Sequence, residues 1–143
     1  MVTIRIYREK DRSQVLALWR ECNLVRPKNN PKKDLDRKKG FGEELFLVLE
    51  EEEKVIGTVM GGYDGHRGII NYLGVHPSYR GQGFGKMLMR AVEKKLNDLG
   101  CPQVNLLVWA NNTEVLDFYE KVQYSKADDI VLLRKRLISD LQN

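Results

Sequence analysis

The sequence predicts a mixed α/β fold in which helices cover both faces of a central, mostly antiparallel sheet. The chain of 143 residues contains no linker, internal repeat or low-complexity tract, so residues 1–143 are expected to form one domain. In the first half, short apolar runs are separated by turn-forming residues, as in antiparallel hairpins. In the second half, strand and helix patterns alternate, as in a βαβ unit. Hairpins followed by such a unit predict a mixed sheet.

The N-terminal segment is expected to contribute one strand and one core helix. Residues 2–8 alternate as an edge or near-edge strand does. Asp11 and Gln14 then match an Asp form of the capping box that opens a helix. The buried face of this helix is expected to carry Val15, Leu18, Trp19 and Cys22, which recur at helical spacing.

Residues 23–40 differ in character from the segment before them. Two Xaa-Pro steps precede a lysine-rich run, so a loop leading into a short polar helix is expected. The simpler interpretation is a solvated surface helix. The alternative is a lid over an acceptor site, in which Arg26 meets a substrate carboxylate. Nucleic-acid binding through residues 28–39 is disfavoured, because Asp34 and Asp36 interrupt the basic run and no aromatic side chains are interleaved.

Two hairpins are expected next. The unbroken apolar run over residues 45–49 is typical of a central strand, and residues 55–60 form the following one. Between them, residues 51–54 form a solvated turn, because consecutive carboxylates on a turn rarely converge on a metal. A second turn lies in residues 61–68, whose four glycines permit positive φ. It leads into a buried strand over residues 69–75.

The loop after this strand, from Arg80 to Lys86, has the composition of an anion site. It reads Arg-Gly-Gln-Gly-Phe-Gly-Lys and opens a helix, whose first N–H groups lack intrahelical partners. Glycines allow a ligand to approach the main chain closely. Arg80 can grip phosphate oxygens bidentately, and Lys86 adds a point charge. The ligand is expected to be a pyrophosphate.

Two common phosphate-binding motifs do not fit the loop. A P-loop needs a longer spacing before Gly-Lys and a following Ser or Thr for magnesium, but Met87 stands there. A dinucleotide fingerprint needs G-x-G-x-x-G and an acid after the next strand. Here Gly81, Gly83 and Gly85 are spaced G-x-G-x-G, and the next strand ends in Ala-Asn-Asn.

The remaining elements complete the βαβ passage. The helix after the loop ends at Gly100, with Pro102 beyond it. A strand over residues 104–109, a helix over residues 112–122 and a C-terminal antiparallel strand over residues 130–137 are expected to follow. The helix that follows the Arg80–Lys86 loop is expected to have one apolar face, formed by Phe84, Leu88, Ala91, Val92, Leu96 and Leu99.

The segment Arg80–Gly85 resembles the R/Q-x-x-G-x-G/A signature of the GCN5-related N-acetyltransferases. Its setting after Leu73-Gly-Val-His-Pro strengthens the resemblance. The resemblance implies the acyl-CoA N-acyltransferase fold and acetyl-CoA as cosubstrate, without a metal. The residues implied to bind the cosubstrate are Leu73, Gly74, Val75, Arg80, Gly81, Gln82, Gly83, Phe84, Gly85, Lys86 and Asn112.

A second motif supports the first. The family pattern of Asn, a small or apolar residue three positions later and Tyr seven positions later is similar to Asn112, Val115 and Tyr119. It implies that Asn112 hydrogen-bonds the pantetheine arm and that Tyr119 stands near the sulfur. From the residues alone, Asn111 and Glu114 also form a plausible capping box. Tyr119 read alone could instead be a buried aromatic residue.

The chemistry of acetyl transfer assigns further roles. Tyr119 can protonate the departing thiolate, because a phenol with a pKa of about 10 stays protonated at neutral pH. Backbone N–H groups near Gly74 and Val75 could polarise the carbonyl. The resemblance implies that the strand has a bulge there, which Gly74 suits, and splays from the neighbouring strand. As base, we expect a water chain held by Asn71 or Tyr72 and leading toward Asp64.

Other candidates keep two interpretations. Trp109 could wall the acceptor pocket or pack in the core. His66 is expected to be a turn residue and His76 to order its loop.

Two departures from the family pattern are Gln123, where relatives often have glycine before an aromatic residue, and the lack of a Glu on the strand before the anion loop.

The sequence therefore predicts an N-acetyltransferase that moves acetyl from acetyl-CoA to a primary amine by direct attack in a ternary complex. The narrower resemblance is to the bacterial YpeA-type acetyltransferases. The alternative is a non-catalytic acyl-CoA-binding or regulatory module. The acceptor could be a small molecule or a peptide. A homodimer is common among relatives, although no residue compels one.

Composition is consistent with this prediction. The net charge of +4 suits an anionic cosubstrate. The sequence has no 18-residue apolar run and no apolar signal core, so no membrane association is expected and a cytoplasmic location follows by default. Two cysteines suggest neither a disulfide framework nor a zinc site.

Overall fold

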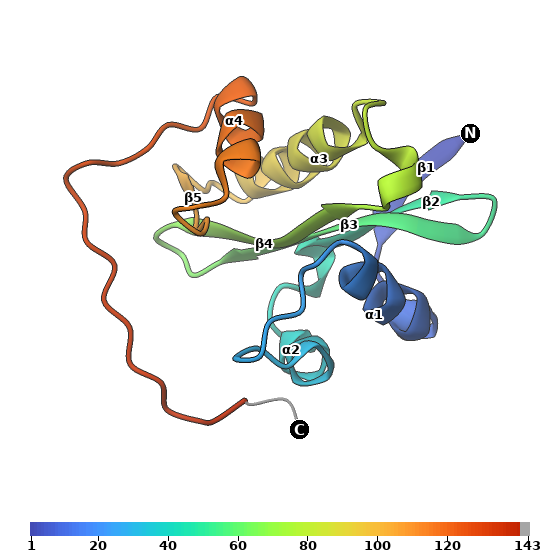
Figure 1. The fold of residues 1–143 in the computed structure, drawn as a ribbon, viewed down its shortest axis with the longest axis horizontal. Helices are drawn as coiled ribbons and strands as arrows, with labels where there is room; N and C mark the ends of the chain where they lie inside the picture. The colour runs from blue at the N-terminus through green and yellow to red at the C-terminus, as the bar shows by residue number, and fades with distance from the viewer. Residues whose placement is uncertain (141–143) are drawn as a thin grey trace.

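The computed structural model describes residues 1–140. Its centre is a five-stranded sheet in the order β1-β2-β3-β4-β5 (Figure 1). An antiparallel meander is formed by β1 (Val2–Ile6), β2 (Phe46–Glu51), β3 (Lys54–Tyr63) and β4 (Gly68–Val75). The last strand, β5 (Val104–Leu106), pairs with β4 in parallel. The predicted mixed and mostly antiparallel sheet is confirmed.

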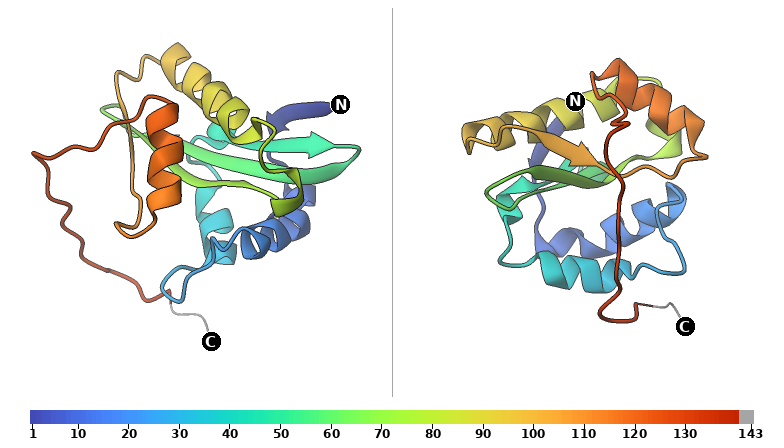
Figure 2. Two further views of the ribbon diagram at one scale, coloured as in Figure 1. Left: turned by 45° about the horizontal axis from the view of Figure 1, so that its top comes forward. Right: turned by 90° about the vertical axis from the view of Figure 1, so that its left-hand side faces the viewer.

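Helices cover both faces of this sheet, as predicted. One face carries α1 and α2, and the other carries α3 and α4 (Figure 2). The helices are α1 (Arg12–Glu21), α2 (Pro31–Lys38), α3 (Phe84–Asp98) and α4 (Thr113–Lys121), with short 3₁₀ turns at Glu9–Asp11, Glu43–Leu45 and Pro77–Tyr79. No helix within residues 1–140 is both long enough and apolar enough to cross a bilayer.

The unbroken apolar run of β2 is explained by burial on both faces of the sheet. Leu47 and Leu49 belong to the core beneath α3. Phe46 and Val48 belong to the core beneath α1 and α2. A strand in this position has no solvent-facing side and therefore shows no polar alternation. The sheet thus separates two apolar cores.

The start of α1 differs from the predicted capping box. Asp11 precedes the helix, but its carboxylate makes no capping bond to it. Instead it accepts hydrogen bonds from the Arg5 guanidinium at 2.8 and 2.9 Å and from the backbone N–H of Arg8. Gln14 accepts a hydrogen bond from the Val55 N–H, at the beginning of β3. Because Asp11 is only 2% exposed, its pair with Arg5 ties the start of α1 to β1.

The predicted C-terminal strand over residues 130–137 is not formed. After α4 the chain runs as an extended arch across the end of the sheet toward α2 (Figures 1 and 2). Arg37 donates two hydrogen bonds to Asp140, at 2.6 and 2.8 Å, which fix the end of the arch on α2. β5 is only three residues long, so it offers the arch little backbone with which to pair.

The end of α4 keeps a left-handed residue although it lacks glycine. Gln123 has a φ of 75°, which costs roughly 1 kcal/mol more than in glycine. The Tyr124 N–H closes the turn by donating to the Tyr119 carbonyl at 2.9 Å. The Tyr124 hydroxyl donates to Glu93 on α3 at 2.6 Å. The helix end is therefore closed without glycine, and Tyr124 secures it to α3.

Candidate functional site

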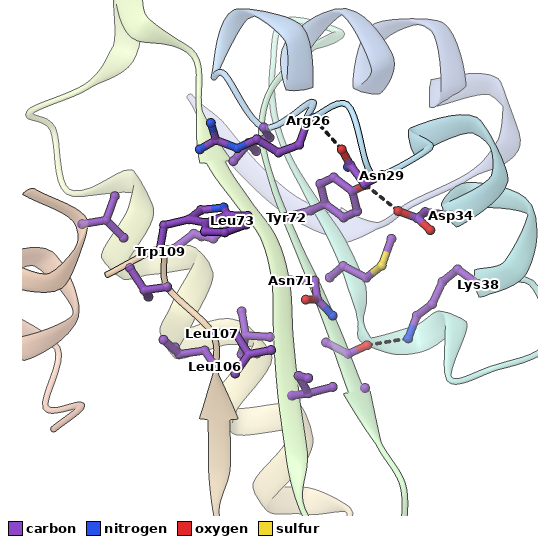
Figure 3. Close-up of a pocket in the computed structure, with 18 of the residues that line it drawn as sticks. Arg26, Asn29, Asp34, Lys38, Asn71, Tyr72, Leu73, Leu106, Leu107 and Trp109 are labelled. Carbon is purple, nitrogen blue, oxygen red and sulfur yellow. Dashed lines mark hydrogen bonds between the residues drawn. The ribbon is translucent and has the colours of Figure 1, made fainter. Parts of the chain in front are cut away.

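A cavity of about 670 Å³ opens where β4 and β5 separate. The two strands pair only from Gly68 opposite Val104 to Ile70 opposite Leu106, and β5 ends there, three residues before the predicted end. Beyond this point the cavity lies between Asn71 to Leu73 of β4 and the segment 106–109 (Figure 3). The splay between neighbouring strands that the family resemblance implies is therefore seen between β4 and β5.

β4 contains a bulge at which Tyr72 adopts a left-handed backbone conformation. Thr58 lies opposite Gly74 and Met60 opposite Asn71, so two residues of β4 face one residue of β3. Tyr72 has a φ of 51°, in the left-handed region. The bulge therefore falls at Tyr72 and its successor, and the expectation that Gly74 forms it is wrong.

Gly74 is needed for a different reason, which is close packing. A Cβ atom at this position would lie 2.9 Å from Cδ1 of Leu24 and 3.2 Å from Sγ of Cys22. Both neighbours belong to the end of α1 and the loop after it. The glycine lets this loop lie directly against β4, at the edge of the cavity.

Three contacts hold the Tyr72 ring and backbone in place. The ring stacks on Trp19 with 3.8 Å between centroids. The Thr58 hydroxyl donates to the Tyr72 carbonyl at 2.8 Å and accepts from the Trp19 indole N–H at 2.9 Å. A left-handed non-glycine residue persists only where its surroundings enforce it. Here the buried Trp19 and Thr58 enforce it.

The Tyr72 hydroxyl links two residues that sequence reasoning did not assign to the site. It donates to Asp34 on α2 at 2.6 Å and accepts from the Asn29 side-chain amide at 2.7 Å (Figure 3). Burial and then the Asp34 carboxylate raise the pKa of Tyr72. The phenol therefore stays protonated and orients Asp34 at the cavity wall, which Asp34 also lines.

The sequence gives only a weak indication that Asp34 belongs to the site. Asn30 caps α2 by accepting the Lys33 N–H at 3.1 Å, and Pro31 begins the helix. These two residues set the phase of α2 and turn Asp34 toward the sheet, where Leu35 is also buried. From sequence alone, Asp34 is indistinguishable from its neighbour Asp36, which pairs with Arg12 outside the cavity. Only the fold separates their roles.

The cavity wall also carries positive charge. Arg26 places its guanidinium 5.9 Å from the centre of the Trp109 ring, a cation–π arrangement (Figure 3). Trp109 is 54% exposed, so it walls the cavity rather than packing in the core. Lys38 donates to the Gly61 carbonyl at 2.5 Å, and burial lowers the pKa of its amine. Within residues 1–140, Arg26 forms no ion pair with a carboxylate.

Tyr119 and Asn112 reach the same cavity from α4. Burial raises the pKa of Tyr119 to about 12. Its ring meets those of Phe118 and Tyr124 edge-on, at 5.2 and 5.9 Å between centroids. Asn112 is the N-cap residue of α4, but its side chain makes no capping bond. The predicted capping box from Asn111 is thus absent, and the Asn112 amide is not engaged in capping the helix.

The predicted anion loop has an open main chain at the start of α3. Gly81 and Gly83 have φ values of 78° and 82°, and no protein atom lies within 4 Å of a Cβ built on either. Gly83 is the N-cap residue of the 15-residue α3. Gly85 is needed for packing instead, since a Cβ there would lie 3.2 Å from the Phe118 ring.

Polar side chains order this loop from both sides. Arg80 donates through Nε to the Val75 carbonyl at 3.1 Å. His76 accepts the Ser78 N–H through Nδ1 at 3.1 Å, which confirms that His76 orders the loop. Arg80 and Lys86 are exposed, so both cations are accessible to an anionic ligand at the helix start.

Asp64 is not brought to the cavity. It lies in the β3–β4 turn and does not line the wall. Its carboxylate accepts the N–H groups of His66 and Arg67, each at 2.7 Å. These bonds, first that from Arg67, lower the pKa of Asp64. Asp64 and His66 therefore act as turn residues, and the predicted proton path toward Asp64 has no support in this geometry.

The fold and the two motifs define a member of an acetyltransferase family. Residues 12–124 match the family model of the acetyltransferase (GNAT) family, so the chain belongs to this family. An acetyltransferase from Sodalis glossinidius is 49% identical over 137 residues, which cover 96% of each chain. An uncharacterized N-acetyltransferase from Yersinia pestis is also 49% identical, with the same coverage. The protein is therefore an acyltransferase of this family.

Solved structures of low sequence identity share the fold. The ribosomal-protein-S18-alanine N-acetyltransferase from Escherichia coli is 19% identical and has a TM-score of 0.76, over 89% of this chain and 79% of that one. The aminoglycoside N-acetyltransferase AAC(6')-Iy, in complex with a coenzyme A bisubstrate analogue of acetylneamine, is 16% identical with a TM-score of 0.75, over 95% and 99% of the two chains. These similarities support the fold alone.

Proposed function

We propose that this protein transfers an acetyl group from acetyl-CoA directly to a primary amine within a ternary complex. The observation that carries the proposal is a single cavity lined from opposite sides by Tyr119 and by Asp34. Tyr119 can supply a proton to a leaving thiolate, and Asp34 can accept one from an ammonium group. A non-catalytic acyl-CoA-binding module would need neither residue.

The cosubstrate fits three features of the chain. The exposed N–H groups at the start of α3, with Arg80 and Lys86, suit a pyrophosphate. The splay between β4 and β5 leads from this loop to the cavity, and the Asn112 amide there can bind the pantetheine arm. The residues that we assign to the cosubstrate are Leu73, Gly74, Val75, Arg80, Gly81, Gln82, Gly83, Phe84, Gly85, Lys86 and Asn112. Bound acetyl-CoA supplies the electrophilic thioester.

The proposed transfer is a direct displacement at this thioester. The amine nitrogen forms a bond to the carbonyl carbon, and the carbon–sulfur bond then breaks. N–H groups of β4 near Gly74 and Val75 are suited to polarise the carbonyl oxygen. Tyr119 gives its phenolic proton to the sulfur, and the proton that the nitrogen loses as the amide forms restores the phenol. Its pKa of about 12 keeps it protonated at neutral pH.

The amine must first lose a proton. A lysine-type amine is neutral only about once in 2,500 molecules at pH 7, and an α-amine in roughly a tenth or more. We assign this proton to Asp34, directly or through a water held by Asn71, because both residues line the cavity and Asp34 is oriented by Tyr72. This assignment replaces the path toward Asp64.

Arg26 and Trp109 suggest the other end of the acceptor. Arg26 lines the cavity over the Trp109 ring and is not paired with a carboxylate in the described chain. A guanidinium in this position suits an acceptor that carries a carboxylate or another anionic group besides its amine. Amino acids and short peptides have this combination.

A panel of acceptors tests the proposal. We would measure thiol release from acetyl-CoA with simple alkylamines, amino acids, their amides and short peptides. The proposal expects turnover on at least one primary amine, and a lower KM for an amino acid than for its amide in the wild type but not in Arg26→Ala. Coenzyme binding without turnover on any amine would favour the binding-module alternative. Turnover with no preference for a carboxylate would refute only the role of Arg26.

A further inference from the structure

The arch after α4 brings a group of cationic side chains to the border of the candidate site. Arg134, Lys135 and Arg136 follow one another in this arch, and all three are exposed. The Arg134 guanidinium lies 5.8 Å from the centre of the Trp109 ring, which lines the cavity. These arch cations therefore begin beside the end of the cavity that carries Arg26 and Trp109, although they are remote from it in the sequence.

A groove of about 280 Å³ lies between the arch and α2. Its charged side chains are the three arch cations, Arg37 and Asp140. Asp140, the one carboxylate among the described residues that line the groove, is 5% exposed and accepts two hydrogen bonds from Arg37. In the part of the chain that the structure describes, neither Arg134 nor Lys135 forms an ion pair. The groove therefore keeps positive charge that the protein itself does not neutralise.

Arg37 joins this groove to the cavity, because its side chain lines both. Its Nη1 atom lies 2.6 Å from the Asp140 carboxylate in the groove and 3.6 Å from the Asp34 carboxylate in the cavity. The arch itself passes from α4 across the end of the sheet to α2 (Figure 2). The groove and the cavity thus adjoin each other, and a ligand longer than the cavity can continue into the groove.

Charges of opposite sign follow one another along this route. Inside the cavity, the Asp34 carboxylate suits the ammonium form of an acceptor before its proton is removed. Arg26 and then the arch cations follow on the way outward. A complementary ligand is positive at the end that enters and negative beyond it. A peptide has this order of charges when its N-terminus is free and its next side chains are acidic.

We propose that the acceptor is the N-terminal α-amine of a peptide or protein whose next residues are acidic, and that these acidic side chains lie in the groove between the arch and α2. This substrate class rests on the transferase activity proposed above. An α-amine is neutral far more often at pH 7 than a lysine amine, so it needs less help to lose its proton. A free amino acid would fill the cavity and leave the groove unused.

Peptide binding tests the groove without depending on turnover. Two peptides with a free N-terminus and a C-terminal fluorescent label, Ala-Glu-Glu-Glu-Ala and Ala-Gln-Gln-Gln-Ala, would be titrated with the protein in the presence of coenzyme A. Fluorescence anisotropy should show about tenfold tighter binding of the acidic peptide, and added salt should shrink the difference. Equal affinities would overturn the proposal. Tighter binding of a labelled single-stranded RNA than of the acidic peptide would also overturn it.

Two double variants locate the contact. Arg134→Gln/Lys135→Gln removes two groove cations that form no ion pair within residues 1–140. Lys54→Gln/Lys94→Gln is the control, because it removes two exposed cations from the β2–β3 hairpin and from α3. The preference for the acidic peptide should fall about threefold or more in the groove variant and should persist in the control. Equal losses would mean that overall charge, rather than the groove, attracts the peptide.

Turnover separates this substrate class from the transferase function itself. Thiol release from acetyl-CoA should be faster with the acidic peptide, with kcat/KM about tenfold higher than for the neutral one. Turnover on small amines without this preference would overturn the groove assignment and leave the transferase function standing. Tight binding of the acidic peptide, with no thiol release from it or from any other amine, would overturn both.

Discussion

At the scale of single residues, Tyr72 determines how the candidate site is arranged. Its left-handed backbone costs roughly 1–2 kcal/mol relative to an ordinary strand residue, and the stacking on Trp19 and the hydrogen bond from Thr58 offset that cost. The strain places a phenol against Asp34, at the wall of the cavity. We therefore expect the Asp34 carboxylate to matter for turnover, although it is remote in sequence from both family motifs.

Replacing the carboxylate of Asp34 should affect activity, whereas the same replacement at Asp36 should not. Asp34→Asn is expected to lower kcat/KM by about 10²-fold or more, the usual scale for loss of a catalytic base. Asp36→Asn makes the same chemical change on the same helix, outside the cavity, and should leave kcat/KM unchanged. Steady-state kinetics at saturating acetyl-CoA would measure both. Equal losses in the two variants would mean that the effect comes from α2 as a whole.

The pH dependence of turnover should reflect the raised pKa of Tyr119. Its protonated form is the active one, and burial raises its pKa to about 12, so the active range extends to higher pH. We expect kcat/KM to rise as the acceptor amine loses its proton and then to stay level through pH ~10, where an ordinary phenol is half ionised. Rates corrected for spontaneous thioester hydrolysis would show this. A decline centred near pH ~10 would contradict the role given to Tyr119.

At the scale of elements, the start of α3 and its glycine loop form the cosubstrate end of the site. Gly81 and Gly83 combine positive φ with open space, whereas Gly85 is set by its contact with Phe118 on α4. The three glycines of this motif therefore have two different structural roles. Two allow approach to the main chain, and one lets α3 and α4 pack closely enough to place Tyr119.

A matched pair of glycine substitutions tests this division. Gly83→Ala and Gly65→Ala both place alanine at positive φ with nothing within 4 Å, so each should lower the free energy of unfolding by about 1 kcal/mol. Only Gly83→Ala should also raise the KM for acetyl-CoA, by about tenfold. Thermal melts and initial rates would measure the two effects. An unchanged KM in Gly83→Ala would place the pyrophosphate elsewhere.

Sequence patterns predicted the elements well where the local pattern alone was sufficient. The β2 run, the face of α1 and the start of α3 each follow from side-chain spacing, and the structure has them. The strand over 130–137 was predicted from its apolar composition, but a strand also requires a neighbour, and this segment pairs with none within residues 1–140. The bulge at Tyr72 depends on Trp19 and Thr58, which no local pattern connects to it.

The candidate site was predicted to a similar extent. Tyr119, Asn112, Arg26, Trp109 and Asn71 all line one cavity, as the assigned roles require. Asp34 was missed, and Asp64 was assigned a role that its turn position does not permit. Asp34 was missed because the position of α2 relative to the sheet is a tertiary property, set by the burial of Leu35 and the cap at Asn30. Asp64 was misassigned because its carboxylate is engaged by the N–H groups of its own turn.

At the scale of the whole molecule, the sheet separates two cores and holds the halves of the cavity together. The β5 edge of the sheet lies at the cavity, and the β1 edge carries a network of ion pairs. In this network, Arg5 on β1 pairs with Asp11 and with Glu50 on β2. Burial alone would raise the pKa of Asp11, but the hydrogen bonds from Arg5 and Arg8 outweigh it and lower that pKa.

This network should make the fold sensitive to acid. A carboxyl group whose pKa is lowered on folding contributes stability above its unfolded pKa of about 3.9, and this contribution is lost as the pH falls through the folded value. The free energy of unfolding should therefore fall below pH ~4, and Asp11→Asn should be less stable at pH 7 but show a weaker loss in acid. Urea titrations from pH 7 down to pH ~2 would measure both slopes. Parallel slopes in the two proteins would contradict the role of Asp11.

The central claim is that Tyr119 protonates the departing sulfur, and one comparison tests it most directly. Coenzyme A affinity and kcat would be measured for the wild type, Tyr119→Phe and Tyr63→Phe. Tyr63 is the control, because its hydroxyl donates to the Gly65 carbonyl in the β3–β4 turn. We predict that Tyr119→Phe binds coenzyme A as the wild type does while kcat falls by about 10²-fold or more, and that Tyr63→Phe matches the wild type. Undiminished kcat in Tyr119→Phe would contradict the proposed mechanism.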